Sequence, residues 1–261
     1  MSNSADLDRF ARFYDLEYSD YDADLRFFRE YAGQVAGFRE HARILEPACG
    51  SGRVLTALAE DGHLCTGLDA SLAMLALARR RAADAGLADK IRLVEGRMEA
   101  LPDGLGSFDL ALCALNSFGY LATQAEQIAA LEGIHGVTAP GGWLLLDLSP
   151  VGADGPFPAS GEMIHQGSWP RQGGGEVSKF VTGTWDSAEQ QQHVRWIYDE
   201  TDAEGRLTRT VIPQTIRYTH RWEVQLLLER TGFRLTELYG SYLFSGYSAE
   251  SERMIIVAER E

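Results

Sequence analysis

The sequence predicts an α/β protein in which helices cover both faces of a parallel sheet, with an antiparallel β insertion in its second half. Three observations lead to this fold class. Short apolar runs alternate with helix-like patterns over the first 150 residues, as buried parallel strands and their connecting helices do. Gly and Pro then gather between 150 and 175, ending in three consecutive glycines. Further β-type runs follow, bounded by turn residues, as in antiparallel hairpins.

Residues 1–40 are the first predicted unit, an N-terminal helical cap. Aromatic and apolar side chains recur there at spacings of three and four, namely Phe10, Phe13, Tyr14, Tyr18, Tyr21, Leu25, Phe28 and Tyr31. This period places them on one helix face, so we expect one or two amphipathic helices.

Residues 41–149 together with 219–261 are expected to form the core. The predicted strands of its first part cover 42–46, 64–69, 91–95, 108–115 and 143–148, and the helices 52–61, 71–85 and 124–137. Ser71 is expected to cap a helix, while Gly62 and Gly86 follow helices as stop signals. A helix over 221–231 and strands over 234–239 and 254–258 complete the core.

Residues 150–218 are the expected insertion. Its predicted strands cover 177–185, 193–198 and 207–218, and Asp202-Ala203-Glu204-Gly205 predicts a hairpin turn between the last two. We expect this insertion to cover the substrate. Because strand edges invite pairing, we also expect it to join two copies of the chain as a homodimer.

Composition narrows the function classes. The chain has 24 Lys and Arg against 38 Asp and Glu, a net charge of −14, which disfavours nucleic acid and anionic membranes as partners. No apolar run is long enough to span a bilayer, and the polar N-terminus does not resemble a secretory signal. Cys49, Cys65 and Cys113 are odd in number and form no CxxC, and the histidines are scattered. We therefore expect a reduced, cytoplasmic protein without a bound metal.

The central motif is a glycine-rich turn between the first predicted strand and helix, Glu46-Pro47-Ala48-Cys49-Gly50-Ser51-Gly52. Glycine lets a ligand approach the backbone more closely than any Cβ would allow. Asp69 closes the next strand, where a carboxylate can accept hydrogen bonds from both hydroxyls of a ribose. Together the two signals predict an adenosine-containing cofactor.

Two such cofactors compete. A nicotinamide dinucleotide prefers Gly-x-Gly-x-x-Gly, but Leu55 stands at the third glycine position. S-adenosylmethionine has no pyrophosphate and carries a cationic ammonium, which suits an acidic residue such as Glu46 just before the turn. An NAD-dependent oxidoreductase remains the rival of a different class.

At this point the sequence resembles the class I S-adenosylmethionine-dependent methyltransferases, over roughly residues 10 to 150 and 215 to 261. The motifs that carry the resemblance are the glycine-rich turn, Leu68-Asp69-Ala70-Ser71, Glu95-Gly96-Arg97-Met98-Glu99-Ala100-Leu101-Pro102, Phe108-Asp109-Leu110-Ala111 and Pro140-Gly141-Gly142. The resemblance implies a Rossmann-like seven-stranded sheet, mostly parallel, with its last strand antiparallel. It also implies S-adenosylmethionine as the cofactor.

Within that family, Phe13-Tyr14-Asp15, Asn116-Ser117-Phe118-Gly119-Tyr120-Leu121 and the β insertion resemble glycine and aminosugar N-methyltransferases. The resemblance implies a small-molecule acceptor, with an amine nitrogen methylated; an oxygen or a carbon stays open. It implies cofactor contacts at Tyr14, Tyr21, Glu46, Ala48, Gly50, Gly52, Asp69, Ala70, Arg97, Met98 and Ala114. Candidate catalytic residues are Tyr14, Asn116 and His220.

One departure concerns the adenine. Family members often have Asp at the position of Arg97, and a guanidinium donates only, so it cannot accept from the adenine amino group. Main-chain groups around Arg97 and Met98 are expected to hold the base instead. Because methyltransferases share no universal catalytic residue, a non-catalytic cofactor-binding protein is a further alternative.

Overall fold

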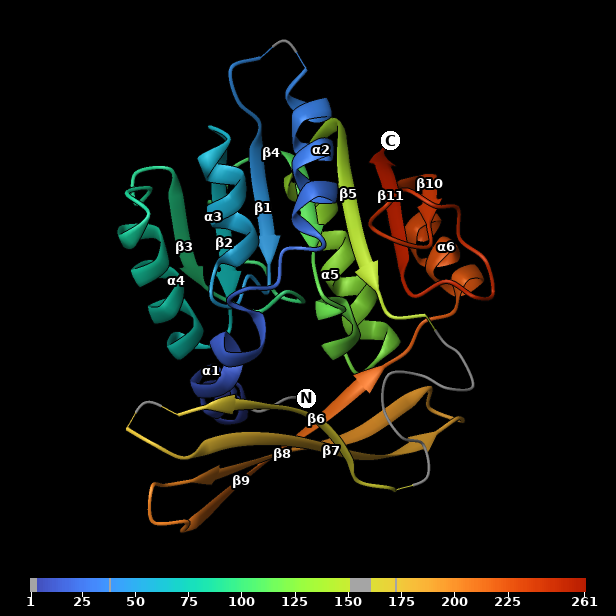
Figure 1. The fold of residues 1–261 in the computed structure, drawn as a ribbon. Helices are drawn as coiled ribbons and strands as arrows, with labels where there is room; N and C mark the ends of the chain where they lie inside the picture. Colours follow the sequence, from blue (N-terminus) through green and yellow to red (C-terminus); the bar gives the residue numbers. More distant parts are fainter. Residues whose placement is uncertain (1–3, 38, 151–160, 172) are drawn as a thin grey trace.

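The computed structural model describes residues 4–37, 39–150, 161–171 and 173–261 (Figure 1). Its larger sheet has seven strands in the order β10 (Phe233–Tyr239), β11 (Met254–Arg260), β5 (Thr138–Leu148), β4 (Phe108–Cys113), β1 (Arg43–Pro47), β2 (Leu64–Asp69) and β3 (Ile91–Glu95). Strands β1 to β5 are parallel, and β11 lies antiparallel between β5 and β10. The predicted fold class is confirmed.

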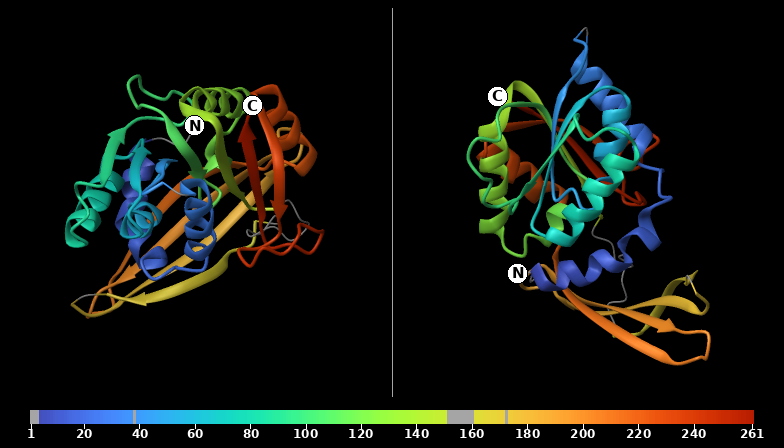
Figure 2. Two further views of the ribbon diagram at one scale, coloured as in Figure 1. Left: turned by 90° about the horizontal axis from the view of Figure 1, so that it is seen from above. Right: turned by 90° about the vertical axis from the view of Figure 1, so that its left-hand side faces the viewer.

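Helices cover both faces of this sheet, as the right-hand view of Figure 2 shows. One apolar core joins the sheet to α2 (Leu25–Ala36), α3 (Arg53–Glu60) and α4 (Leu72–Asp84). The other core joins it to α5 (Gln124–Val137) and α6 (Arg221–Arg230). Ser71 caps α4 as expected, because its hydroxyl accepts a hydrogen bond from the Met74 amide.

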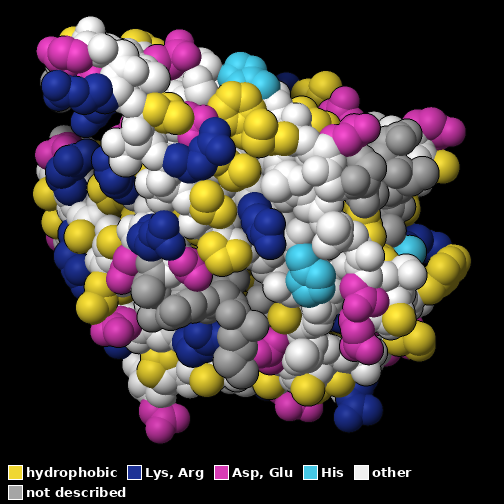
Figure 3. Space-filling model, turned by 90° about the horizontal axis from the view of Figure 1, so that it is seen from below, with side chains coloured by type: hydrophobic (Ala, Val, Ile, Leu, Met, Phe, Trp, Pro, Cys, Tyr) yellow, Lys and Arg dark blue, Asp and Glu magenta, His cyan; other side chains and the backbone are white. Residues whose placement is uncertain are grey.

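A separate antiparallel sheet has four strands in the order β6 (Ile164–Pro170), β7 (Glu176–Asp186), β8 (Gln191–Thr201) and β9 (Leu207–Arg217). Gly205 donates to the Asp202 carbonyl at 3.0 Å in the predicted turn between β8 and β9. Seen from below in the orientation of Figure 1, acidic and basic side chains are interspersed among hydrophobic ones, and the described part of this face has no continuous basic patch (Figure 3).

Two strands differ from the sequence-based expectation. β6 lies in the Gly- and Pro-rich part of the insertion, where no strand was predicted, because its residues are mostly exposed and show no alternation. Residues 151–160 of that stretch lie outside the described residues. β5 begins at Thr138 rather than at Trp143, and its pairing with β4 is irregular around Pro140-Gly141-Gly142. Gly141 has a φ of 70°, which lets the strand continue through that irregularity.

The N-terminal residues form two helices, α1 (Ser4–Tyr18) and α2, and only α1 lies next to the second sheet (Figure 1). Phe13 of α1 stacks on Tyr198 of β8 with ring centroids 4.0 Å apart, and Phe10 contacts Trp196 of the same strand. The parallel strands of the larger sheet end toward α1. The carboxyl ends of these strands, α1 and the second sheet thus meet in one place.

Candidate functional site

The loop between β1 and α3 turns through an unusual backbone. Ala48, Gly50 and Gly52 all have positive φ, at 59°, 54° and 74°. A Cβ added at Gly52 would lie 3.0 Å from the Cβ of Ala78, so this glycine permits close packing of the turn on α4. A Cβ at Gly50 would instead point toward the ring of Tyr14, 3.6 Å away. Gly50 is therefore the glycine that faces the neighbouring hollow.

Asp69 fixes this turn from the end of β2. One carboxylate oxygen accepts from the Gly50 amide at 2.8 Å, and the other accepts from the Ser71 amide at 2.9 Å. Burial raises the pKa of Asp69, and the two amide hydrogen bonds oppose that shift. Since each carboxylate oxygen has a second lone pair, the side chain can still accept from a ligand.

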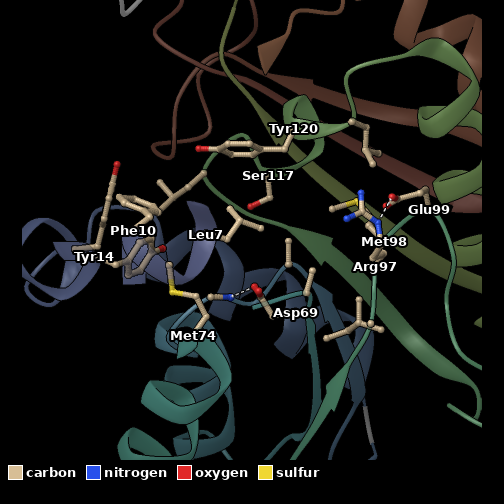
Figure 4. A pocket seen from close by; sticks show the side chains of 18 of the residues that line it. Leu7, Phe10, Tyr14, Asp69, Met74, Arg97, Met98, Glu99, Ser117 and Tyr120 are labelled. Carbon is tan, nitrogen blue, oxygen red and sulfur yellow. Dashed lines mark hydrogen bonds and ion pairs between the residues drawn. The ribbon is translucent and has the colours of Figure 1, made fainter. Parts of the chain in front are cut away.

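The hollow beside this turn encloses about 1010 Å³ of space not filled by atoms, part of it open to solvent (Figure 4). Its lining includes Ala48, Gly50, Asp69 and Ala70 from the strand ends, and Gly96, Arg97, Met98 and Glu99 from the segment after β3. An aromatic group completes it, with Phe10, Tyr14 and Tyr18 from α1, Tyr120 from the short helix η1 (Ser117–Tyr120) and Trp196 from β8.

A small side cavity opens next to the same turn, lined among others by Tyr14, Glu46, Arg53 and Ala114. The Arg53 guanidinium donates to both oxygens of the fully buried Asp24, at 2.7 and 2.6 Å. Yet Arg53 Nε and Glu46 Oε2 are buried without a hydrogen-bond partner among the described residues. Burial raises the pKa of Glu46 well above its usual value, and the positive charge of Arg53 opposes that shift.

The unpartnered Arg53 Nε and Glu46 Oε2 indicate which ligand groups the side cavity can bind. Buried polar groups in native proteins normally find a partner, and an unpaired buried charge is costly. A ligand end that carries both an ammonium and a carboxylate would satisfy both atoms, the ammonium donating to Glu46 and the carboxylate accepting from Arg53. The methionine part of S-adenosylmethionine is such a group, so the residues present fit the expected cofactor.

Most of the predicted cofactor residues lie together. Seven line the hollow, namely Tyr14, Ala48, Gly50, Asp69, Ala70, Arg97 and Met98, and Glu46 and Ala114 line the side cavity. The Arg97 guanidinium forms an ion pair with Glu99. Because a guanidinium has only donors, this side chain cannot accept a hydrogen bond from the adenine amino group. Gly52 and Tyr21 line neither space: Gly52 packs against Ala78 of α4, and the ring centroid of Tyr21 lies 5.2 Å from the Arg53 guanidinium.

Of the other candidate catalytic residues, Asn116 stands between two lining residues, Leu115 and Ser117, whereas the chain neighbours of His220 do not line the hollow. Asn116, with a φ of 60°, accepts from the Ser149 amide at 3.1 Å and thereby holds the chain after β5. His220 is exposed at the start of α6, with its ring against Tyr218. Neither belongs to the lining of the hollow.

Sequence reasoning also missed residues of the site. Arg53 follows the glycine turn directly, a position that could have drawn attention to it, whereas its partner Asp24 lies in no motif. Tyr120 lies in a segment that resembles a family motif but is not itself a predicted site residue, and Trp196 has no sequence signal beyond an alternating strand pattern.

Of the described residues, no three His, Cys, Asp or Glu side chains gather as metal ligands would. Among the described helices, none combines the length and apolarity needed to cross a membrane.

The chain is similar to known methyltransferases in sequence and in fold. Residues 44–142 match the family described as methyltransferase domain. The chain is 29% identical over 235 residues to the cypemycin N-terminal methyltransferase of a Streptomyces species, covering 88% of this chain and 90% of that protein. It is 36% identical over 141 residues to a dTDP-3-amino-3,6-dideoxy-alpha-D-glucopyranose N,N-dimethyltransferase of Streptomyces fradiae, covering 52% of each. The solved structure of SAM-bound CalS10, an amino pentose methyltransferase from Micromonospora echinaspora, superposes with a TM-score of 0.70 at 24% identity, covering 95% of this chain and 96% of that one.

Proposed function

Because the chain belongs to the class I S-adenosylmethionine-dependent methyltransferases, we propose that it transfers a methyl group to an amine nitrogen of a small molecule. The unpartnered Glu46 Oε2 and Arg53 Nε, beside the turn that Asp69 fixes, are the observation that carries this proposal. Relatives support the amine, since the names of the two Streptomyces proteins describe methylation of an N-terminus and of an amino sugar.

We assign the cofactor contacts from this geometry. Asp69 would accept from the ribose hydroxyls, and Gly50 would leave room for the adenosyl group. The segment from Gly96 to Met98 would face the adenine, while Glu46 and Arg53 would hold the methionine end. When bound, the cofactor supplies a methyl group that its sulfonium has already activated for displacement.

The residues around the reaction site align the acceptor and exclude water rather than remove a proton. Burial raises the pKa of Tyr14, Tyr18 and Tyr120, so all three are neutral phenols at neutral pH and cannot act as bases. An amine needs no base if it binds in its neutral form, and an uncharged, buried pocket favours that form over the ammonium. An oxygen or carbon acceptor that needs deprotonation finds no such base among these residues.

The test is a methylation assay with the purified chain, S-adenosylmethionine and a panel of primary and secondary amines. We expect S-adenosylhomocysteine to form together with N-methylated product, located by mass spectrometry and NMR. Exclusive methylation of oxygen or carbon would refute the choice of nitrogen. Binding of S-adenosylhomocysteine without turnover of any acceptor would favour a non-catalytic cofactor-binding protein.

We further propose that α1 and the second sheet cover the substrate, that the chain pairs through the exposed edge of β6 as a homodimer, and that it works in the cytoplasm. Edge strands support pairing, and the three cysteines are buried and free, as suits a reducing compartment. Sedimentation analysis of the wild-type chain, compared with the Ile164→Pro variant in β6, tests the dimer.

A further inference from the structure

The two ends of the hollow differ in charge. Its charged lining residues among those described are Asp69, Arg97 and Glu99, and all three lie on the side where the strands of the larger sheet end. Asp69 is held by two backbone amides, and Arg97 and Glu99 neutralise one another. The opposite end, formed by α1, η1 and β8, presents uncharged side chains to the space as far as the described residues go.

That uncharged end is a cage of aromatic rings. Tyr14 and Tyr18 stack with centroids 4.8 Å apart, Phe10 meets Tyr14 edge-on at 5.3 Å, and Tyr120 meets Trp196 edge-on at 6.4 Å. Figure 4 shows Phe10 and Tyr14 on one side of the hollow and Tyr120 and Ser117 along another. Such a surface packs favourably against a ring or another compact apolar group.

Polarity in this cage comes from hydroxyl groups. Within the described residues, the hydroxyls of Tyr14, Tyr18 and Tyr120 make no hydrogen bond, and none is fully enclosed by protein atoms. They can therefore donate to an oxygen on a bound molecule. The Lys179 ammonium lies 5.0 Å from the Trp196 ring centroid, and it is already paired with the Glu17 carboxylate.

We propose that the acceptor is an amine on a compact, ring-bearing body that carries no phosphate or carboxylate, with an oxygen that accepts hydrogen bonds from the tyrosines. This inference rests on the proposed function and narrows its substrate class. An anionic group in this cage would lose its hydration without meeting an unpaired cation among the described lining residues, which is strongly unfavourable. In this respect the proposed acceptor differs from the dTDP-linked sugar that the name of the Streptomyces fradiae relative describes.

A matched pair of probes tests the proposal, namely tyramine and tyramine O-phosphate, which share the amine and the ring. The full chain is first titrated with S-adenosylhomocysteine by calorimetry, and the saturated complex is then titrated with each probe. We expect tyramine to bind at least about tenfold more tightly than its phosphate, and thymidine diphosphate not to bind. Equal or tighter binding of the phosphate, or no binding of tyramine, would overturn the inference. A failure of S-adenosylhomocysteine to bind would instead refute the cofactor site.

A variant links the preference to the cage. Tyr120→Phe keeps the ring but removes one hydroxyl, so we expect tyramine to bind about three- to tenfold more weakly, with unchanged S-adenosylhomocysteine affinity. Tyr218→Phe, which alters a tyrosine outside the hollow, is the matched control and should change neither affinity. Unchanged tyramine affinity in Tyr120→Phe would contradict the hydrogen bonds proposed here, and so would a loss of tyramine affinity matched by an equal loss of cofactor affinity.

Discussion

The cofactor side and the aromatic side of the hollow are built in different ways. The cofactor side comes from consecutive strand ends, with backbone turns and charged groups as its main features. The aromatic side comes from α1, η1 and β8, which are far apart in the sequence and contribute uncharged rings. The first side therefore has short-range sequence signals, whereas the second exists only after the second sheet packs against α1. We expect variants on the cofactor side to act on cofactor binding and stability, and variants on the aromatic side to act on acceptor choice.

Arg53→Met should have the largest effect, because it leaves the fully buried carboxylate of Asp24 without its partner. Removing one member of a buried ion pair costs about 3–5 kcal/mol, so the free energy of unfolding in urea should fall by that amount. Arg29→Met is the control, since its partners Glu60 and Asp61 are at the surface and such pairs contribute about 0–1 kcal/mol. Similar losses in both variants would argue against a special role of the buried pair.

Gly50→Val tests the close approach of the ligand to the turn. The added side chain would occupy space facing Tyr14, so we expect cofactor affinity to fall at least about 100-fold, or roughly 2.7 kcal/mol. Calorimetry with S-adenosylhomocysteine measures the change. Gly62→Val is the matched control, since Gly62 also has positive φ but no atoms near an added Cβ. If both variants lose stability but Gly50→Val still binds S-adenosylhomocysteine with unchanged affinity, the positive φ alone accounts for glycine at position 50.

Asp69→Ala should weaken cofactor binding by roughly 1–3 kcal/mol, because it removes the acceptor expected for the ribose hydroxyls and frees the Gly50 amide. Asp84→Ala, at an exposed position of α4, serves as the control. If Asp69→Ala binds the cofactor with unchanged affinity, Asp69 does not accept hydrogen bonds from the ribose hydroxyls.

The contrast between the two sides also explains what the sequence could predict. The sheet, its helices and the residues from Glu46 to Asp69 follow from short apolar runs and from a glycine-rich turn, which are local patterns. The edge strand β6 was not foreseen because its residues are mostly exposed and lack alternation. Trp196 reads as an ordinary strand residue, and only its contact with Phe10, more than 180 positions away, brings it to the site.

Asn116 and Arg53 show the limit of motif reasoning within the core. Asn116 lies in a segment that resembles a family motif, yet its side chain accepts from the Ser149 amide and does not line the hollow. Arg53 was not singled out, although its guanidinium sets the charge of the side cavity. A residue type at a position does not reveal which of its polar atoms remain unpartnered, and that depends on the packed structure.

The smallest expected effect is a pH dependence of cofactor affinity that arises at Glu46. Burial raises the pKa of this carboxyl, so its protonated form persists to a higher pH in the folded chain than in the unfolded one. Stability contributed by this group should therefore fall as pH rises from the unfolded pKa towards the folded one. Cofactor affinity should change in the opposite direction, because the ammonium prefers the ionised carboxylate. We expect about a three- to tenfold gain in S-adenosylhomocysteine affinity across this interval, measured by calorimetry, and its loss in Glu46→Gln. A gain of the same size in Glu46→Gln would assign the titration to another group and leave Glu46 outside the cofactor contacts.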